Sequence, residues 1–483
     1  MVLAERVTPS PEPVAAERES ASFRDPSGFV FRRDGVLYRQ VNRRFASEWD
    51  AFLKSGLYDR LAADGILLPH EQAPLDVALV PDDAHAVIKP RAVEFISYPY
   101  EWSFGQLKDA ALLTLRAQAL ALERGFTLRD ASAYNVQFVD GAPILIDSLS
   151  FEPLEPGQPW EAYRQFCQHF LAPLALVAYR DPRLALLLRE FLDGIPLDLA
   201  ARLLPVRTRL SVGLGSHIHL HARAQARSGS AADAADAARG SSGAQSRGSR
   251  RMGRTGQLAI LDSLRSTVEK LDWRPQGTTW SGYTRVTSYS ETAAASKLAI
   301  VERFLGQTSG RWVWDLGANT GTFSRLAARL GRSALALDGD AGAVEQAYRE
   351  LKRDGERAVL PLVVDLSSPS PALGWALRER RSILGRANAD VVLALALVHH
   401  LAIGNNVPLD EIAGFLASLG RELIVEFVPK EDPMVVGMLA HRRDVFPDYS
   451  LDGFRAAFAP VFDMAQEALV KDSPRTLFLM RRR

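Results

Sequence analysis

Val313-Trp-Asp315-Leu-Gly317-Ala-Asn319-Thr-Gly321-Thr-Phe323 is the stretch that decides the fold of this 483-residue chain. Its apolar residues, interrupted only by Asp315, predict a buried parallel strand. The glycines that follow predict a tight turn, because glycine has no side chain and tolerates positive φ. The pattern after Phe323 predicts a helix. A strand, a glycine-rich turn and a helix in this order let the backbone come close to a ligand.

Two more strands carry an acid at or near their carboxyl ends. The strand Ala334–Asp338 ends in Asp338, and the strand Leu360–Leu366 carries Asp365 as its last residue but one. The rest of this half alternates in the same way and predicts a doubly wound α/β fold. We expect further strands at 390–397 and 422–427, a helix at 409–419 and a closing hairpin over 462–480.

The acid followed by Gly317, Asn319 and Gly321 resembles motif I of the class I S-adenosylmethionine-dependent methyltransferases, with asparagine, a residue that tolerates the left-handed conformation, at the middle position. The resemblance implies S-adenosyl-L-methionine as cofactor and a seven-stranded Rossmann-like methyltransferase sheet with an antiparallel strand near its end. Carried over position by position, the roles are the methionine end for Asp315, Gly317, Asn319 and Gly321, the ribose hydroxyls for Asp338, and the adenine amino group for Asp365. A nicotinamide-dinucleotide site and a core without ligand are the alternatives.

The segment Val398-His399-His400-Leu401 follows the fourth strand, where an open α/β sheet places its ligands. A histidine with an ordinary pKa near 6.5 can take a proton from an acceptor hydroxyl. The alternative is that one of the pair caps the next helix and packs beneath the cofactor. Glu426, at the end of the fifth strand, is a further catalytic candidate.

Absent motifs narrow the methyl acceptor. No Asn/Asp-Pro-Pro-Tyr/Phe stretch follows the fourth strand, as it does in amino-methylating nucleic-acid enzymes. Cytosine-C5 enzymes need a cysteine nucleophile, and the single cysteine, Cys167, lies in the other half. No basic stripe interleaved with aromatic residues is present, and the net charge is +1. We therefore expect a small-molecule, glycan or natural-product acceptor, methylated on oxygen or nitrogen, and no nucleic-acid partner.

The first half has its own motif. Asp130 is followed by Asn135, and a hairpin predicted at Asp140-Gly141 leads to a second acid, Asp147. The motif resembles the catalytic segment of the protein-kinase and aminoglycoside-phosphotransferase superfamily. That resemblance implies an α+β kinase-like domain in which Asp130 orients a hydroxyl while Asn135 and Asp147 hold magnesium on the phosphates of ATP.

The motif departs from that superfamily in ways that bear on activity. Arg39 stands where the phosphate-binding lysine is expected, with Lys89 as the one substitute, and no glycine-rich loop precedes it. We expect a degenerate kinase-like accessory domain; a helical domain with a structural Asp/Asn turn is the alternative. His217, His219 and His221 could share one face of a strand, but ordinary surface histidines are favoured over a metal site.

Composition divides the chain into four parts. Residues 1–22 read as a disordered lead, 23–223 as the kinase-like domain, 224–256 as a flexible linker of Ala, Ser, Gly and Arg, and 257–483 as the methyltransferase domain. The aromatic residues Trp280, Tyr283 and Tyr289 are candidates for a cap over the pocket. We find no signal peptide and no span long enough for a bilayer, so the expected location is the cytoplasm.

The sequence thus predicts a methyltransferase tethered to a kinase-like domain, and the whole arrangement resembles bacterial two-domain methyltransferases of the nodulation-protein type. Two alternatives remain open. One is a bifunctional enzyme that phosphorylates and methylates its substrate. The other is a non-catalytic protein that senses S-adenosylmethionine or ATP. The oligomeric state does not follow from the sequence.

Overall fold

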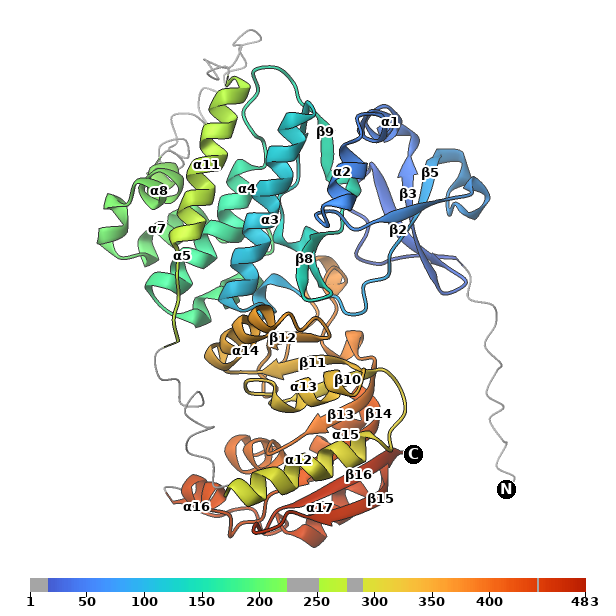
Figure 1. Ribbon diagram of the computed structural model, residues 1–483, viewed down its shortest axis with the longest axis vertical. Helices are drawn as coiled ribbons and strands as arrows, with labels where there is room; N and C mark the ends of the chain where they lie inside the picture. The colour runs from blue at the N-terminus through green and yellow to red at the C-terminus, as the bar shows by residue number, and fades with distance from the viewer. Residues whose placement is uncertain (1–15, 224–251, 276–289, 441–442) are drawn as a thin grey trace.

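The computed structural model describes residues 16–223, 252–275, 290–440 and 443–483. Figure 1 shows two bodies, one above the other. The amino-terminal body consists of residues 16–223 together with the segment around α11 (Arg254–Lys270). The carboxyl-terminal body runs from α12 (Glu291–Leu305) to the end of the chain.

A seven-stranded sheet forms the centre of the carboxyl-terminal body, as predicted. Its strand order is β12-β11-β10-β13-β14-β16-β15. The first five strands are parallel and β16 lies antiparallel between β14 and β15. The strands are β10 (Trp312–Leu316), β11 (Ser333–Asp338), β12 (Val359–Val363), β13 (Ala389–Ala394), β14 (Gly420–Phe427), β15 (Phe462–Leu469) and β16 (Thr476–Arg482).

Helices cover both faces of this sheet, which explains why its strands read as continuous apolar runs. Val313 of β10 packs with α12 and α13 (Thr322–Arg329), whereas its neighbour Trp314 faces the core that includes α15 (Leu409–Leu419) and α17 (Leu451–Phe458). Helix α14 (Ala341–Asp354) contacts β11 and β12 and also the amino-terminal body. Helix α16 (Pro433–Leu439) completes this half.

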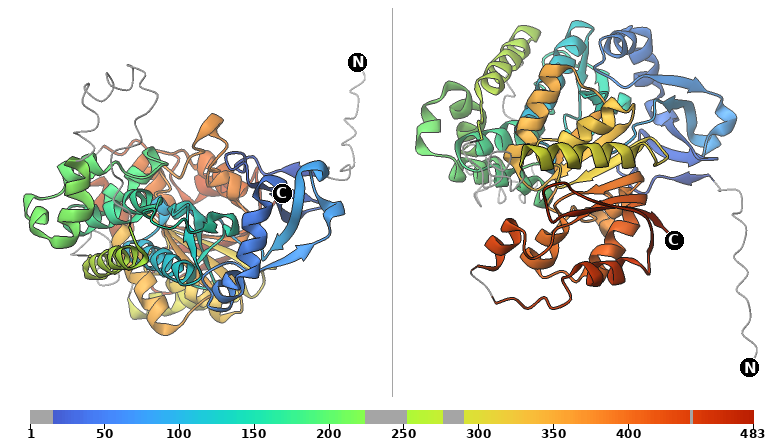
Figure 2. Two further views of the ribbon diagram at one scale, coloured as in Figure 1. Left: turned by 90° about the horizontal axis from the view of Figure 1, so that it is seen from above. Right: turned by 60° about the horizontal axis from the view of Figure 1, so that its bottom comes forward.

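The amino-terminal body begins with a five-stranded antiparallel sheet of order β1-β2-β3-β5-β4, which Figure 2 shows at one side of the molecule. Its elements are β1 (Glu17–Arg18), β2 (Gly28–Arg33), β3 (Val36–Asn42), α1 (Ala46–Lys54), α2 (Leu57–Ala63), β4 (His70–Ala73) and β5 (Ala84–Pro90). Of the lead predicted over 1–22, residues 1–15 lie outside the described part. β1, within the rest, pairs with β2.

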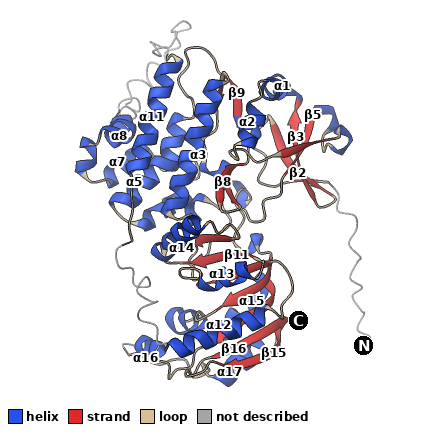
Figure 3. Ribbon diagram, viewed as in Figure 1, coloured by secondary structure: helices blue, strands red, loops and turns tan. Residues whose placement is uncertain are grey.

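A mainly helical part follows, and Figure 3 shows it beside the sheet. Two antiparallel pairs interrupt the helices, β6 (Phe126–Leu128) with β9 (Phe151–Pro153) and β7 (Val136–Val139) with β8 (Ala142–Leu145). The β7–β8 hairpin turns at Asp140-Gly141, both with positive φ, which confirms the predicted turn. The helices are α3 (Phe104–Glu123), α4 (Tyr163–Phe166), α5 (Ala172–Tyr179), α6 (Leu187–Glu190), α7 (Leu197–Leu203) and α8 (Val212–Leu214).

Helix α11 lies in the stretch predicted to be linker and the start of the methyltransferase domain, yet it packs on α3. Leu261, Leu264 and Val268 are buried in this contact layer. The Lys108 ammonium of α3 donates to the carbonyls of Glu269 and Leu271, at 2.8 and 2.7 Å, and so satisfies the carboxyl end of α11. We therefore propose that the amino-terminal domain extends through α11. Most of the predicted linker lies outside the described residues.

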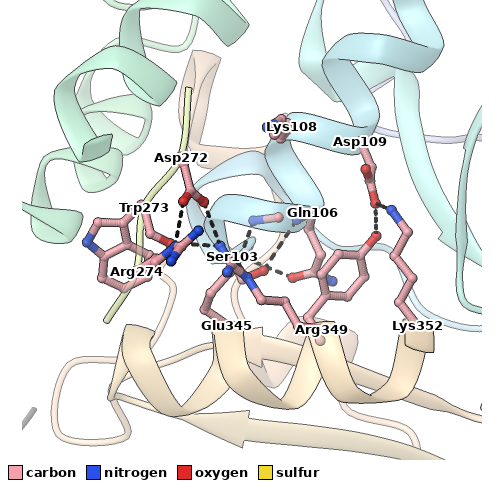
Figure 4. Close-up of polar contacts among 12 residues, drawn as sticks. Ser103, Gln106, Lys108, Asp109, Asp272, Trp273, Arg274, Glu345, Arg349 and Lys352 are labelled. Carbon is pink, nitrogen blue, oxygen red and sulfur yellow. Dashed lines mark hydrogen bonds and ion pairs between the residues drawn. The ribbon is translucent and has the colours of Figure 1, made fainter. Parts of the chain in front are cut away.

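A polar joint between α3 and α14 holds the two bodies together (Figure 4). The fully buried Glu345 accepts the amide of Gly105 at 2.7 Å, which satisfies one of the free N–H groups at the start of α3. One turn on, Tyr348 and Lys352 both donate to Asp109, at 2.6 Å. Arg349 donates to Glu345 at 2.6 Å and to the Trp273 carbonyl at 2.7 Å. One face of α14 therefore makes the whole joint.

A second contact involves the segment that leads into α3. Arg386 donates to both carboxylate oxygens of the buried Glu101 and to the Ile96 carbonyl. Phe95 meets Trp314 of β10 edge to face at 5.5 Å between ring centroids. The segment from Phe95 to Gly105 thus contacts the carboxyl-terminal body at several points, at β10, at Arg386 and at α14. Among the residues that the structure describes, no helix is long and apolar enough to cross a membrane.

The joint depends on a glycine. A Cβ at Gly105 would lie 2.8 Å from Cδ1 of Tyr348 and 3.2 Å from the Glu345 carboxylate. We expect Gly105→Ala to destabilise the protein by about 1–3 kcal/mol, because the tyrosine ring is held by Asp109 and cannot withdraw freely. Thermal unfolding followed by calorimetry measures the loss.

Gly414→Ala is the matched control. Gly414 lies on the exposed side of α15 with open space around its Cβ position, so the substitution should be neutral or stabilising. Equal unfolding temperatures for Gly105→Ala and the unaltered chain would contradict the tight joint.

Candidate functional site

The three predicted acids lie at one edge of the seven-stranded sheet, the edge at which the parallel strands end and which we call the carboxyl edge. Asp315 is in β10, Asp338 ends β11 and Asp365 comes two residues after β12. The three strands are neighbours, and Asp338 pairs in register with Val363 of β12. The structure therefore brings the acids together, as the sequence predicted.

The glycine-rich turn connects β10 to α13 beside these acids. Gly317, Asn319 and Gly321 all have positive φ, at 71°, 50° and 82°. Asparagine therefore occupies the left-handed conformation expected of it. The backbone amide of Asn319 donates to the Asp338 carboxylate at 2.7 Å, and this bond connects the turn to β11. The turn and the ribose-binding candidate form one unit.

Burial sets the electrostatics of the first two acids. The Asp315 side chain is buried and accepts the Ser324 hydroxyl at 2.7 Å. Loss of solvent raises the pKa of Asp315 to about 6, against the opposing effects of Ser324 and the Lys297 ammonium. Burial also raises the pKa of Asp338 above its ordinary value. Asp365 differs, because it is exposed, and its carboxylate accepts the amide and the hydroxyl of Ser367.

The two predicted histidines follow β13, and their rings are in contact at a tilt of 38°, with ring centroids 4.1 Å apart. His399 is fully buried, and neither of its ring nitrogens has a hydrogen-bond partner among the described residues. Burial lowers the pKa of His399 to about 2, so the ring is neutral at physiological pH. Burial also lowers the pKa of His400, which is the more accessible of the two.

Glu426 ends up inside a network of buried charges that the sequence did not reveal. Its carboxylate accepts the Lys297 ammonium at 2.7 Å and lies 3.9 Å from the Arg475 guanidinium. Arg475 in turn pairs with Asp432 at 2.6 Å. All four side chains are at most 8 % exposed. The sequence signal that could have indicated a buried Lys297 is its position on the apolar stripe of α12, beside Ala293 and Ile300.

The three candidates of the amino-terminal half also come together. Asp130 accepts from the Ser132 amide at 2.9 Å, and its pKa is raised by burial and by the nearby Asp147 carboxylate. The side chain of Asn135 hydrogen-bonds to that of Asp130. Asp147 lies 2.7 Å from the Arg39 guanidinium of β3. The same carboxylate also accepts the Leu149 amide and the Ser150 hydroxyl.

Lys89 does not replace the expected lysine. Its ammonium is half exposed and lies 4.0 Å from Glu71. The histidines at 217, 219 and 221 are not on a strand, as the metal interpretation assumed, but on a helical turn. His217 contacts Tyr163 and Ser263, and His219 contacts Thr208. No metal-ligand cluster occurs in the described part of the chain. Trp280, Tyr283 and Tyr289 lie outside it.

A comparison with known proteins finds a relative over nearly the whole chain. The chain is 36 % identical to nodulation protein NoeA of Rhizobium meliloti over 469 residues, which cover 96 % of each protein. No protein-family model matches. Solved structures similar to part of the chain include a magnesium protoporphyrin IX methyltransferase from Synechocystis (TM-score 0.31, 17 % identity, 43 % of this chain and 95 % of that one) and N-methyltransferase NodS from Bradyrhizobium japonicum (0.30, 11 %, 40 % and 98 %). The bifunctional kinase-methyltransferase WbdD matches with a TM-score of 0.29 at 16 % identity, over 42 % of this chain and 41 % of that one.

Asp315 makes the stability of this body depend on pH. Its folded-state pKa of about 6 lies above the ordinary 3.8, so rising pH favours ionisation in the unfolded chain first. The stability that protonated Asp315 contributes is therefore lost between about pH 4 and pH 6. At pH 7 the free energy of unfolding of Asp315→Asn should exceed that of the unaltered chain by at most about 3 kcal/mol. This difference should shrink toward pH 4.

Calorimetric unfolding over this pH range measures the difference between the two chains. Asp410→Asn, at an exposed aspartate of α15, is the control and should show no such trend. A difference for Asp315→Asn that stays constant with pH would refute the assignment of a desolvated carboxylate.

Proposed function

Since the chain belongs to the family of nodulation protein NoeA over nearly its whole length, we propose one function for its two bodies together: an S-adenosylmethionine-dependent methyltransferase with a kinase-like accessory domain. The observation that carries the proposal is the set of three acids at adjoining strand ends, Asp315, Asp338 and Asp365, beside a turn with left-handed backbone. A sheet of this order binds its ligands at the carboxyl edge.

The residues at this edge fit the cofactor. Asp315 with the turn 317–321 would hold the methionine end, because a buried carboxylate suits an ammonium group. Asp338 would bind the ribose hydroxyls; it already accepts amides of Asn319 and Asp340, and each carboxylate oxygen has a further lone pair. Asp365 is exposed and free to reach an adenine amino group. When bound, S-adenosylmethionine supplies an activated methyl group.

The acceptor is an oxygen or nitrogen of a small molecule, glycan or natural product. We assign proton removal to His400, since it is partly accessible and burial keeps its ring neutral. His399 is fully buried behind it and positions the His400 ring. Glu426 is enclosed and ion-paired with Lys297, so we assign it the role of ordering the site.

The kinase-like interpretation of the amino-terminal domain rests on Asp130, Asn135 and Asp147, which gather beside β3 of the five-stranded antiparallel sheet. Arg39 favours the degenerate form of that domain. A guanidinium stays charged and binds carboxylates in a fixed fork, so it neutralises the carboxylate that magnesium would need. We propose that this domain transfers no phosphate, in contrast to a bifunctional enzyme.

Transfer of a labelled methyl group from S-adenosylmethionine tests the proposal, with the full chain and a panel of glycan and small hydroxyl or amine acceptors. Asp338→Ala should weaken cofactor binding about 10- to 100-fold, because two charge-assisted hydrogen bonds to ribose are lost. His400→Ala should lower turnover and leave cofactor affinity within about threefold.

Asp410→Ala, at an exposed site on α15, should change neither quantity. Tight cofactor binding without transfer to any acceptor would favour the sensing protein instead. Unchanged affinity in Asp338→Ala would refute the site.

The amino-terminal domain has a separate test. We expect magnesium to leave ATP binding by the full chain unchanged and ATP to remain intact, because Arg39 covers Asp147. Arg39→Ala uncovers that carboxylate and should make ATP binding respond to magnesium. Titration calorimetry and phosphate release give the two readouts. Magnesium-dependent hydrolysis by the unaltered chain that is lost in Asp147→Ala would establish the bifunctional enzyme.

A further inference from the structure

Lys297 is a buried cation at the carboxyl edge for which the sequence gave no role. It projects from the apolar stripe of α12, and its side chain is only 8 % exposed. A lysine is almost never buried without a partner, because its ammonium loses its hydration. The Glu426 carboxylate at 2.7 Å supplies one partner.

The position of the ammonium is defined by three separate elements. Besides Glu426 at the end of β14, it lies 5.2 Å from the ring centroid of Phe323, which is in the first turn of α13. It is also near enough to Asp315 for its charge to lower the pKa of that carboxyl. The strand order reverses between β10 and β13, which are neighbours in the sheet. The edge beside them is therefore the switch point at which open α/β sheets bind their ligands.

Asp315 and Lys297 together place one buried carboxylate and one buried ammonium beside the glycine-rich turn. This pair is the charge complement of an α-amino acid, whose ammonium and carboxylate are held on one carbon. The methionyl end of S-adenosylmethionine is such a group, and the adenosine end has neither charge. The complementarity therefore concerns only one end of the cofactor.

We propose that Lys297 binds the α-carboxylate of the methionyl end while Asp315 binds its ammonium. The assignment rests on the proposed function and adds a residue to its cofactor site. An ammonium has three N–H donors, so Lys297 can keep Glu426 on one and offer another to the ligand. Glu426 then holds the lysine in place and is a positioning residue.

Two nucleosides separate this role from a purely structural one. S-adenosylhomocysteine carries the amino-acid end, whereas 5′-methylthioadenosine has the same adenosine and thioether without it. Titration calorimetry of the full chain with both compounds is the experiment. Lys297→Met should weaken S-adenosylhomocysteine about 10- to 100-fold and leave 5′-methylthioadenosine within about threefold. Lys297→Arg should retain part of the lost affinity, because the charge remains.

The controls address fold and site in turn. Lys471→Met removes an exposed lysine of the same body and should change neither affinity. Asp338→Ala should weaken both compounds alike, since both carry the ribose. If Lys297→Met fails to fold, Lys297→Met with Glu426→Leu removes both buried charges together and should show the same selective loss.

The outcomes are distinguishable. An equal effect of Lys297→Met on both compounds, or no effect on either, overturns the assignment of Lys297 and leaves the proposed function standing. Binding of neither compound by the unaltered chain overturns the proposed function and the assignment with it.

Discussion

Charge taken out of water at the carboxyl edge is the constraint on which the rest of the carboxyl-terminal body depends. Lys297, Glu426, Arg475, Asp432 and Asp315 are all nearly inaccessible to solvent. A buried ion is tolerated only when an opposite charge and hydrogen bonds replace the lost hydration. The partners come from α12, β10, β14, the start of α16 and the start of β16, so each of these elements has to reach the same place. Buried charges of both signs at one edge suit a ligand that itself carries charges of both signs.

The joint between α14 and α3 connects this edge to the amino-terminal body. Helix α14 starts directly after the turn that carries Asp338 and Asp340, and its next two turns hold Glu345 and Arg349. Because Glu345 accepts the Gly105 amide, the start of α3 fixes the helix that begins at the ribose-binding candidate. The amino-terminal body is therefore a structural part of the proposed cofactor site and more than a tethered neighbour. Similarity to NoeA over 96 % of both chains fits a unit that is kept whole.

Local patterns were enough to predict the strands, the glycine-rich turn, the left-handed Asn319 and the hairpin at Asp140-Gly141, because backbone conformation at these places depends on neighbours in sequence. Strand-end acids could be placed for a related reason: parallel strands end at one edge. The partners of Glu426 and Asp147 could not be predicted, since Lys297 and Arg39 lie about 130 and 110 residues away and no local pattern links them. The packing of α11 on α3 could not be predicted for the same reason. A low-complexity stretch precedes α11, and only tertiary contacts determine which of the two bodies it joins.

The segment between the amino-terminal sheet and α3 bears on the proposal that this domain transfers no phosphate. In the proposed kinase-like domain, the segment between the sheet and α3 takes the place of the hinge between the two lobes. Here that segment is fixed: Phe95 packs on Trp314, Glu101 pairs with Arg386 inside the protein, and Gly105 is bound by Glu345. We propose that this fixed segment and the pairing of Asp147 with Arg39 leave the domain without a magnesium site. The same rigidity is an advantage for a support that must keep the cofactor edge of the neighbouring sheet in place, because binding then pays less for ordering the site.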